Sequence, residues 1–189
     1  MDFKFEQVNK DNIAQFEALC SLVIPYFHEI DSHYADREKL PDDVIIKYVQ
    51  SMISKQGDLD RHLEICTINN NVIGFYHAKV DHIGHTGYIK PEYGFIMEFY
   101  IIPEYRRKGI GALMYQRIVS LFMNHDVKSI YLTTDPVTGK PFWEKQSRNS
   151  PSFFRFMKNV HTVRCFLTQK SKITMTVIMQ FYILIRSLI

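Results

Sequence analysis

The sequence that decides the fold is the stretch Phe95-Ile96-Met97-Glu98-Phe99-Tyr100-Ile101-Ile102-Pro103-Glu104-Tyr105-Arg106-Arg107-Lys108-Gly109-Ile110-Gly111. Its first eight residues are almost all apolar and predict a strand, and residues 109–123 predict an amphipathic helix. The apolar residues at helical spacing are Ile110, Leu113, Met114, Ile118, Leu121 and Phe122. A helix start leaves backbone N–H groups unpaired and carries partial positive charge, and glycines let an anion approach. The basic glycine turn therefore predicts a phosphate site.

The rest of the chain up to about residue 146 predicts further strands and helices. Strands are predicted at 3–8, 63–68, 72–80 and 128–133, helices at 13–27 and 41–55, and a short helix or a turn at 139–146. Asp11 is the predicted cap of the first helix, Pro41 suits the first turn of the second, and 69–71 predict a hairpin turn. Residues 31–39 and 81–93 are predicted loops. This pattern predicts an α/β domain.

Composition indicates one globular domain in a reducing compartment. The chain has 189 residues, of which 46% are hydrophobic, enough to bury a core. Cys20, Cys66 and Cys165 are widely spaced and form neither a CxxC motif nor a metal-ligand pattern, so we expect free thiols. The first residues contain no apolar signal segment, so we expect a cytoplasmic protein.

Charge changes abruptly near residue 145. All 20 acidic residues lie at or before Glu144, and the 45 residues after it contain eight Lys or Arg. We therefore predict a first part at 1–145 and an atypical basic and apolar segment at 146–189. A divergent tail and a segment read in a different frame both explain the change. The tail contains predicted strands at 163–167 and 173–189.

The segment 146–189 also indicates which kinds of partner to expect. The apolar run 173–189 contains an internal Arg and is short for a membrane span, so we expect no membrane association. It is a candidate interface strand of a homodimer. No nucleic-acid-binding signature accompanies the basic residues, so no nucleic-acid partner is expected.

The central stretch resembles the acetyl-CoA site of the GNAT superfamily of N-acetyltransferases. The match is Arg-x-x-Gly-x-Gly after a strand that ends in Tyr-Ile-x-Pro, and the order of predicted elements is the family's order up to about residue 145. A dinucleotide fingerprint is excluded because Met114 stands where its third glycine belongs, and no Walker loop is present. The resemblance implies a single-domain α/β fold with a mixed, mostly antiparallel sheet and flanking helices.

The resemblance also implies the acetyl-CoA-binding residues. They are Tyr100, Ile101, Ile102, Arg106, Arg107, Lys108, Gly109, Ile110, Gly111 and Ala112. Backbone N–H groups of residues 107–111 would hold the pyrophosphate, and the side chains of Arg106 and Lys108 would add positive charge. Gly109 and Gly111 would keep side chains away from the phosphates. The Ile101 N–H would polarise the thioester carbonyl.

Two residues of the same strand are catalytic candidates. Glu98 stands where such enzymes often place a base; the alternative is a carboxylate that faces solvent or pairs with a lysine. Where the family often has a tyrosine that reprotonates the CoA thiolate, this chain has Trp143, which has no acidic proton of useful pKa. Tyr100 or Tyr131 is the candidate substitute. Trp143 either stacks on a ligand or packs in the core.

The implied reaction is direct acetyl transfer from acetyl-CoA to a primary amine of a small molecule or peptide in a ternary complex. No cysteine lies in the motif region, so no covalent intermediate is predicted. The alternative is a CoA-binding sensor that has lost catalysis.

Two polar groups of residues remain outside the motif. The cluster of His28, Glu29, Asp31, His33 and Asp36 is either a cationic-amine site or a solvated loop. His77, His82 and His85 lack partners at metal-ligand spacing, so no metal is expected.

Overall fold

The computed structural model describes residues 2–33, 38–56, 60–81, 93–127, 129–132, 134–135 and 137–149, without the side chains of 148 and 149. In these residues, five strands form one sheet in the order β1-β2-β3-β4-β5. The strands are β1 (Phe3–Gln7), β2 (Arg61–Ile68), β3 (Asn71–Val80), β4 (Tyr93–Ile101) and β5 (Ser129–Leu132). The first four are antiparallel neighbours, and β5 runs parallel to β4. The predicted mixed, mostly antiparallel α/β fold is confirmed.

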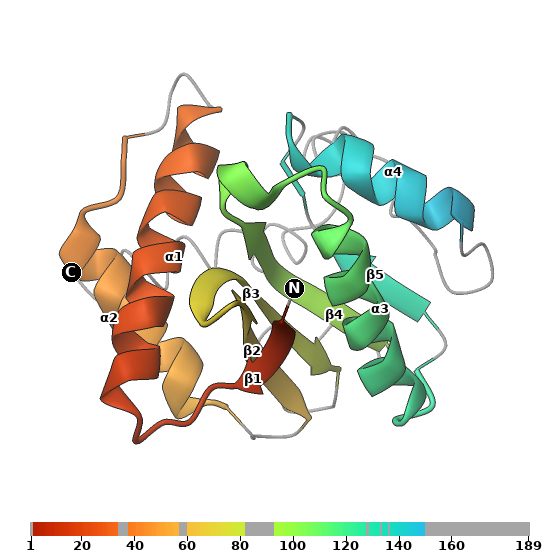
Figure 1. The fold of residues 1–189 in the computed structure, drawn as a ribbon, viewed down its shortest axis with the longest axis horizontal. Helices are drawn as coiled ribbons and strands as arrows, with labels where there is room; N and C mark the ends of the chain where they lie inside the picture. Colours follow the sequence, from red (N-terminus) through yellow and green to blue (C-terminus); the bar gives the residue numbers. More distant parts are fainter. Residues whose placement is uncertain are drawn as a thin grey trace, which may run out of the picture.

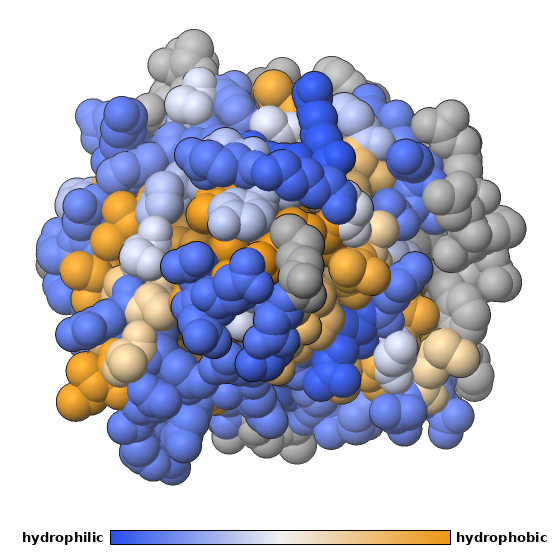
Figure 2. All heavy atoms as spheres, in the orientation of Figure 1, coloured by the Kyte–Doolittle hydropathy of each residue, from blue (hydrophilic) through white to orange (hydrophobic). Residues whose placement is uncertain are grey.

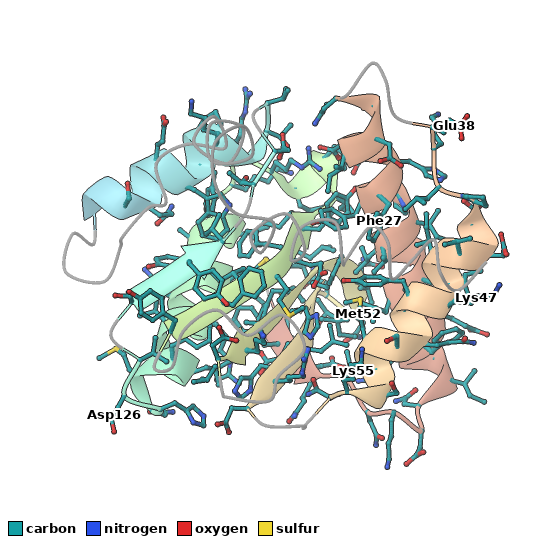
Figure 3. All side chains as sticks on the ribbon, turned by 180° about the vertical axis from the view of Figure 1, so that it is seen from behind. Phe27, Glu38, Lys47, Met52, Lys55 and Asp126 are labelled. Carbon is teal, nitrogen blue, oxygen red and sulfur yellow. The ribbon has the colours of Figure 1, made fainter. Side chains whose placement is uncertain are left out.

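Helices cover both faces of this sheet (Figure 1). One face carries α1 (Ile13–Ser32) and α2 (Asp42–Ser54), and the other carries α3 (Ile110–Met123) and α4 (Gly139–Asn149). Each side has its own hydrophobic cluster, because successive strand residues point to opposite faces. In Figure 3, Met52 of α2 points into the molecule and Lys47 points away from it. The amphipathic pattern of the helices therefore decides which side faces the sheet.

Three details differ from the sequence predictions. The cap of α1 is Asn12, whose side chain accepts from the Gln15 N–H, and not Asp11. The same helix continues five residues past its predicted end at Phe27, to Ser32, where the Asp31 carboxylate is buried and accepts a hydrogen bond from the Leu40 N–H at 3.2 Å. Leu113 is 46% exposed and does not join the core of α3. For α3, periodicity identified the buried face correctly but wrongly included Leu113, which lies at the boundary of that face.

Several predictions fall outside the described residues. They concern the strands at 163–167 and 173–189, most of the loop 81–93, His82, His85, Cys165 and Asp36. No helix in the described ranges is long and apolar enough to span a bilayer.

Strand β4 is irregular where the catalytic candidates lie. Its register with β3 shifts between His77 and Ala78, which leaves Met97 as an extra residue between Ile96 and Glu98. Bulges of this kind bend a strand and redirect its side chains, and they are common beside active sites. Strand β5 pairs with β4 only over 93–96. In the described part of the chain, 97–101 therefore has β3 as its one strand neighbour and an open edge on the other side.

Close packing of α3 on β4 gives the first testable prediction. A Cβ atom on Gly94 would lie 2.4 Å from the ring of Phe122. We expect Gly94→Ala to lower stability by about 1–3 kcal/mol, because a filled core site must shift its backbone or ring. Thermal unfolding measures this, and Phe122→Leu in the same chain is expected to recover most of the loss. Additive losses in the double variant would contradict the contact.

Candidate active site

The turn before α3 has the backbone geometry of an anion site. Arg107 and Gly109 both have positive φ, 60° and 83°, and Gly109 is the N-cap of α3 without a side-chain cap. Among the described residues, no partner accepts from the backbone N–H groups of residues 107–111. Arg107 and Lys108 are exposed on this turn. Unpaired N–H groups, a helix start and two basic side chains together suit a phosphate.

The two glycines of the turn serve different purposes. Gly109 is needed for its left-handed backbone, with φ at 83°. Packing does not require the glycine, since a Cβ there would meet nothing within 4 Å. A Cβ on Gly111 would lie 3.0 Å from the ring of Phe142 and 3.4 Å from Ile101. The glycine at 111 therefore also lets α3 approach β4 and α4, a packing role that the sequence analysis did not predict.

Arg106 anchors the turn to the rest of the fold. Its guanidinium binds the Glu29 carboxylate of α1 through two hydrogen bonds, of 2.8 and 2.6 Å. Its Nε donates to the Ile101 carbonyl at 2.8 Å. Bidentate pairs fix geometry as well as charge. The side chain expected to add free positive charge to the phosphate site is thus engaged in holding β4, the turn and α1 together.

The backbone of Ile101 faces the open edge of β4. The neighbouring Ile102 N–H donates to Ile73 of β3, so that residue points toward β3. In an antiparallel strand the N–H and C=O of one residue point to the same edge, and successive residues alternate. Ile101 therefore points away from β3, consistent with its carbonyl reaching Arg106. Its N–H is directed to the side on which β5 has already ended.

Glu98 is buried and held by two side chains. It is 6% exposed; the His77 Nδ1 lies 2.8 Å from Oε2, and the Tyr48 hydroxyl donates to Oε1. Burial, with the nearby Glu98 charge, raises the pKa of Tyr48 well above its usual value, so this phenol stays a donor. The alternative expectation, an exposed carboxylate or one paired with a lysine, is wrong. The structure places a buried carboxylate beside the open edge of β4.

The aromatic candidates have different surroundings. Tyr100 lies on the same face as Glu98, packs against Tyr26 and lies under the Arg106 guanidinium at 5.4 Å. Burial raises its pKa, so it is protonated at neutral pH. The Tyr131 hydroxyl donates to the buried Asp81 carboxylate at 2.8 Å, which occupies it. Trp143 is buried among aromatic rings, so it packs in the core.

The polar cluster at the end of α1 is not a solvated loop. Glu29 binds Arg106, Asp31 is buried, His28 Nε2 lies 3.1 Å from Asp42, and His33 lies 3.3 Å from Asp135. Within the described ranges, no group of three or more His, Cys, Asp or Glu side chains could hold a metal ion. The cluster thus holds α1 to its neighbours.

Neither described cysteine is an activated nucleophile. Burial raises the pKa of both the Cys20 and Cys66 thiols. A raised thiol pKa leaves little thiolate at neutral pH.

Hydrophobic atoms are visible in the middle of the face shown in Figure 2, with hydrophilic atoms around them.

Comparison with known proteins decides the family. The sequence model of the acetyltransferase (GNAT) family matches residues 16–145. The chain belongs to the GNAT family. No curated protein sequence matches it significantly. As a GNAT protein it is an acetyl-CoA-dependent acetyltransferase, and acetyl-CoA is its cosubstrate.

Solved structures confirm the GNAT fold. PaiA N-acetyltransferase from Thermoplasma acidophilum, in complex with coenzyme A, is 17% identical with a TM-score of 0.60 over 77% of this chain and 89% of that one. AAC(6')-Iy in complex with a bisubstrate analogue, CoA-S-monomethyl-acetylneamine, is 16% identical with a TM-score of 0.53 over 78% and 89%. An aminoglycoside acetyltransferase from an uncultured soil metagenomic sample, in complex with sisomicin, is 14% identical with a TM-score of 0.54 over 81% and 91%.

The Arg106–Glu29 ion pair of this GNAT protein predicts that a substitution in α1 weakens the binding of acetyl-CoA at the turn. Glu29→Ala leaves the half-buried guanidinium without its carboxylate, which costs about 1–3 kcal/mol. We expect a lower melting temperature and a weaker acetyl-CoA affinity, because the turn loses its tether to α1. Isothermal titration and thermal unfolding measure the two effects. Glu17→Ala, at an exposed position of the same helix, is the matched control; equal effects of both variants would refute the anchor.

Sequence reasoning missed the partners of the predicted residues. Tyr48 was not considered as a site residue, and His77 was considered only together with His82 and His85 as a metal ligand. Asp135 was not expected at all, yet its carboxylate accepts from the N–H groups of Val137, Thr138 and Gly139 at the start of α4. Burial acts to raise the pKa of Asp135, but hydrogen bonds from this turn lower it overall. An Asp before a helix start is a signal that could have identified this cap.

Proposed function

We propose that this acetyltransferase transfers the acetyl group from acetyl-CoA directly to a primary amine, with Glu98 as the general base. The proposal rests on one observation. The buried Glu98 carboxylate and the outward-facing backbone of Ile101 lie three residues apart on the part of β4 that has one free edge. The turn with the geometry of an anion site follows directly in the chain. A base, a carbonyl-polarising donor and a phosphate cradle in this order suit thioester aminolysis.

The cosubstrate is proposed to lie along this line of groups. Backbone N–H groups of residues 107–111, with the exposed Arg107 and Lys108, bind the pyrophosphate. The open edge of β4 at Tyr100–Ile102 pairs with the pantetheine arm, and the Ile101 N–H polarises the thioester carbonyl. The start of α3 at Ile110 and Ala112 completes the cradle. Arg106 contributes by holding the strand and the turn in register.

The base is proposed to act on the acceptor. An alkylammonium has a pKa near ~10.4, so it must lose a proton before it attacks. Glu98 takes that proton, directly or through water, and the amine then forms the amide bond as the C–S bond breaks. The CoA thiolate leaves with a pKa near ~8.5 and needs only a hydrogen-bond donor. Tyr100, on the same face of β4 and protonated, is the proposed donor.

Direct transfer is supported by the cysteines as well, because both described thiols have raised pKa values. The proposed acceptors are small-molecule or peptide amines. Initial rates of thiol release, with neamine, an alkylamine and a lysine peptide as acceptors, test the proposal. Intersecting double-reciprocal lines are expected for a ternary complex, and parallel lines would indicate a covalent intermediate. Acetyl-CoA binding without turnover on any amine would instead support a sensor.

A further inference from the structure

Glu98 receives its hydrogen bonds from two different elements. The His77 Nδ1 on β3 reaches one oxygen, and the Tyr48 hydroxyl on α2 reaches the other. His77 is 2% exposed, so this contact is shielded from water. A carboxylate held at both oxygens has one orientation, whereas an unsupported one rotates freely. Each oxygen retains acceptor capacity for an amine or water, because a carboxylate has about four lone-pair sites.

The bulge in β4 brings this contact about. Without the extra residue Met97, the side chain of position 98 would point to the opposite face of the sheet, because faces alternate along a strand. With it, Glu98 and His77 are directly opposite on the face covered by α1 and α2. The local irregularity is thus tied to one particular partner on β3.

The tautomer of His77 follows from the partners of its two nitrogens. Nδ1 faces a carboxylate oxygen, so the neutral ring must carry its proton there in order to donate. Nε2 is buried, and no described residue is hydrogen-bonded to it. The neutral ring is therefore expected to be the Nδ1-protonated tautomer, whose N–H holds the carboxylate.

We propose that His77 is the positioning residue for Glu98, which it holds by donating its Nδ1–H to one carboxylate oxygen. This inference rests on the proposed function, in which Glu98 is the base. His77 orients the carboxylate toward the acceptor and takes no proton from it.

The other groups that face the pair keep one charge state near neutral pH. They are Tyr48 from α2, Tyr26 from α1 and Arg61 from β2. Burial and the Glu98 charge raise the pKa of both phenols, so they stay neutral, and arginine stays charged.

Three variants test whether the Nδ1 donor positions Glu98. His77→Ala removes the donor, and we expect kcat to fall by about 10- to 100-fold with an unchanged KM for acetyl-CoA, since misplacing a catalytic group has this size of effect. His77→Asn keeps a donor in the place of Nδ1 and is expected to restore kcat to within a few-fold of the wild-type value. His62→Asn on β2 is the matched control and is expected to change neither kcat nor KM.

These outcomes decide the proposal. Wild-type kcat in His77→Ala, or a kcat in His77→Asn as low as that of His77→Ala, overturns it. If Glu98→Gln is fully active, the base assignment itself has failed, which is a different result. Nitrogen NMR of histidine-labelled wild-type protein needs no acceptor and no variant. It is expected to show His77 protonated at Nδ1, and an Nε2-protonated ring would overturn the inference.

Discussion

Replacing Glu98 by glutamine is expected to lower kcat by about 10²- to 10⁴-fold, the usual contribution of a general base. The amide has nearly the shape of the carboxylate, so the Tyr48 contact and the buried packing are largely kept. The affinity for acetyl-CoA is expected to stay within a few-fold, because the phosphate turn lies elsewhere on the chain. Steady-state rates on the best amine of the panel, with isothermal titration of acetyl-CoA, measure both quantities.

The control for this substitution is Glu104→Gln. Glu104 is an exposed glutamate in the short helix that follows β4, six residues from Glu98. Its loss is expected to leave kcat unchanged. A Glu98→Gln enzyme with the wild-type kcat would refute the assignment of Glu98 as the base. A loss of acetyl-CoA binding would instead mean that the substitution had disturbed β4 itself.

The second large effect is expected at Gly109. Gly109→Glu adds a carboxylate at the start of α3, where it opposes the phosphates and competes for the unpaired N–H groups. We expect the Kd for acetyl-CoA to rise by about 100-fold, which corresponds to roughly 2.7 kcal/mol. The structure has room for the new side chain, since nothing lies within 4 Å of a Cβ at this position. The folded state is therefore expected to survive with a small loss from the positive φ.

Gly109→Asn separates charge from backbone strain. Asparagine tolerates the left-handed conformation better than most residues and adds no charge. Its Kd is expected to stay within about tenfold of the wild-type value. Equal weakening by Asn and Glu would show that backbone freedom, rather than electrostatics, decides binding. Unchanged binding in both would place the pyrophosphate away from Arg107–Gly111.

The local elements could be predicted from the sequence because their causes are local. The apolar run ending at Pro103, the helical spacing after Gly109 and the Asn-rich hairpin turn each follow from residues a few positions apart. The family resemblance rested on the same contiguous motif, and the family model matches 16–145. Boundaries were less certain. Helix α1 runs five residues past the predicted end, where Asp31 accepts from the Leu40 N–H beyond the helix and Glu29 binds Arg106, 77 residues along the chain.

The site partners could not be predicted, because they depend on register. Periodicity identified the strand that carries Glu98 but gave no information on a bulge at Met97. One residue of shift exchanges the two faces of a strand. Whether Glu98 meets His77, a lysine or solvent was therefore undetermined. Arg106 is a similar case, since its charge predicted a phosphate contact and its actual partner, Glu29, is 77 residues away.

The sequence by itself determined the strand, the glycine turn and the helix of the acetyl-CoA motif, since backbone propensity, apolar spacing and unpaired helix-start groups are properties of neighbouring residues. Only the tertiary structure decided which side chains act together. The pairing of β3 with β4 and the packing of α2 brought His77 and Tyr48 onto Glu98, and the packing of α1 brought Glu29 onto Arg106. Such contacts arise from the closure of long loops and from strand register, which the order of residues along one segment does not contain.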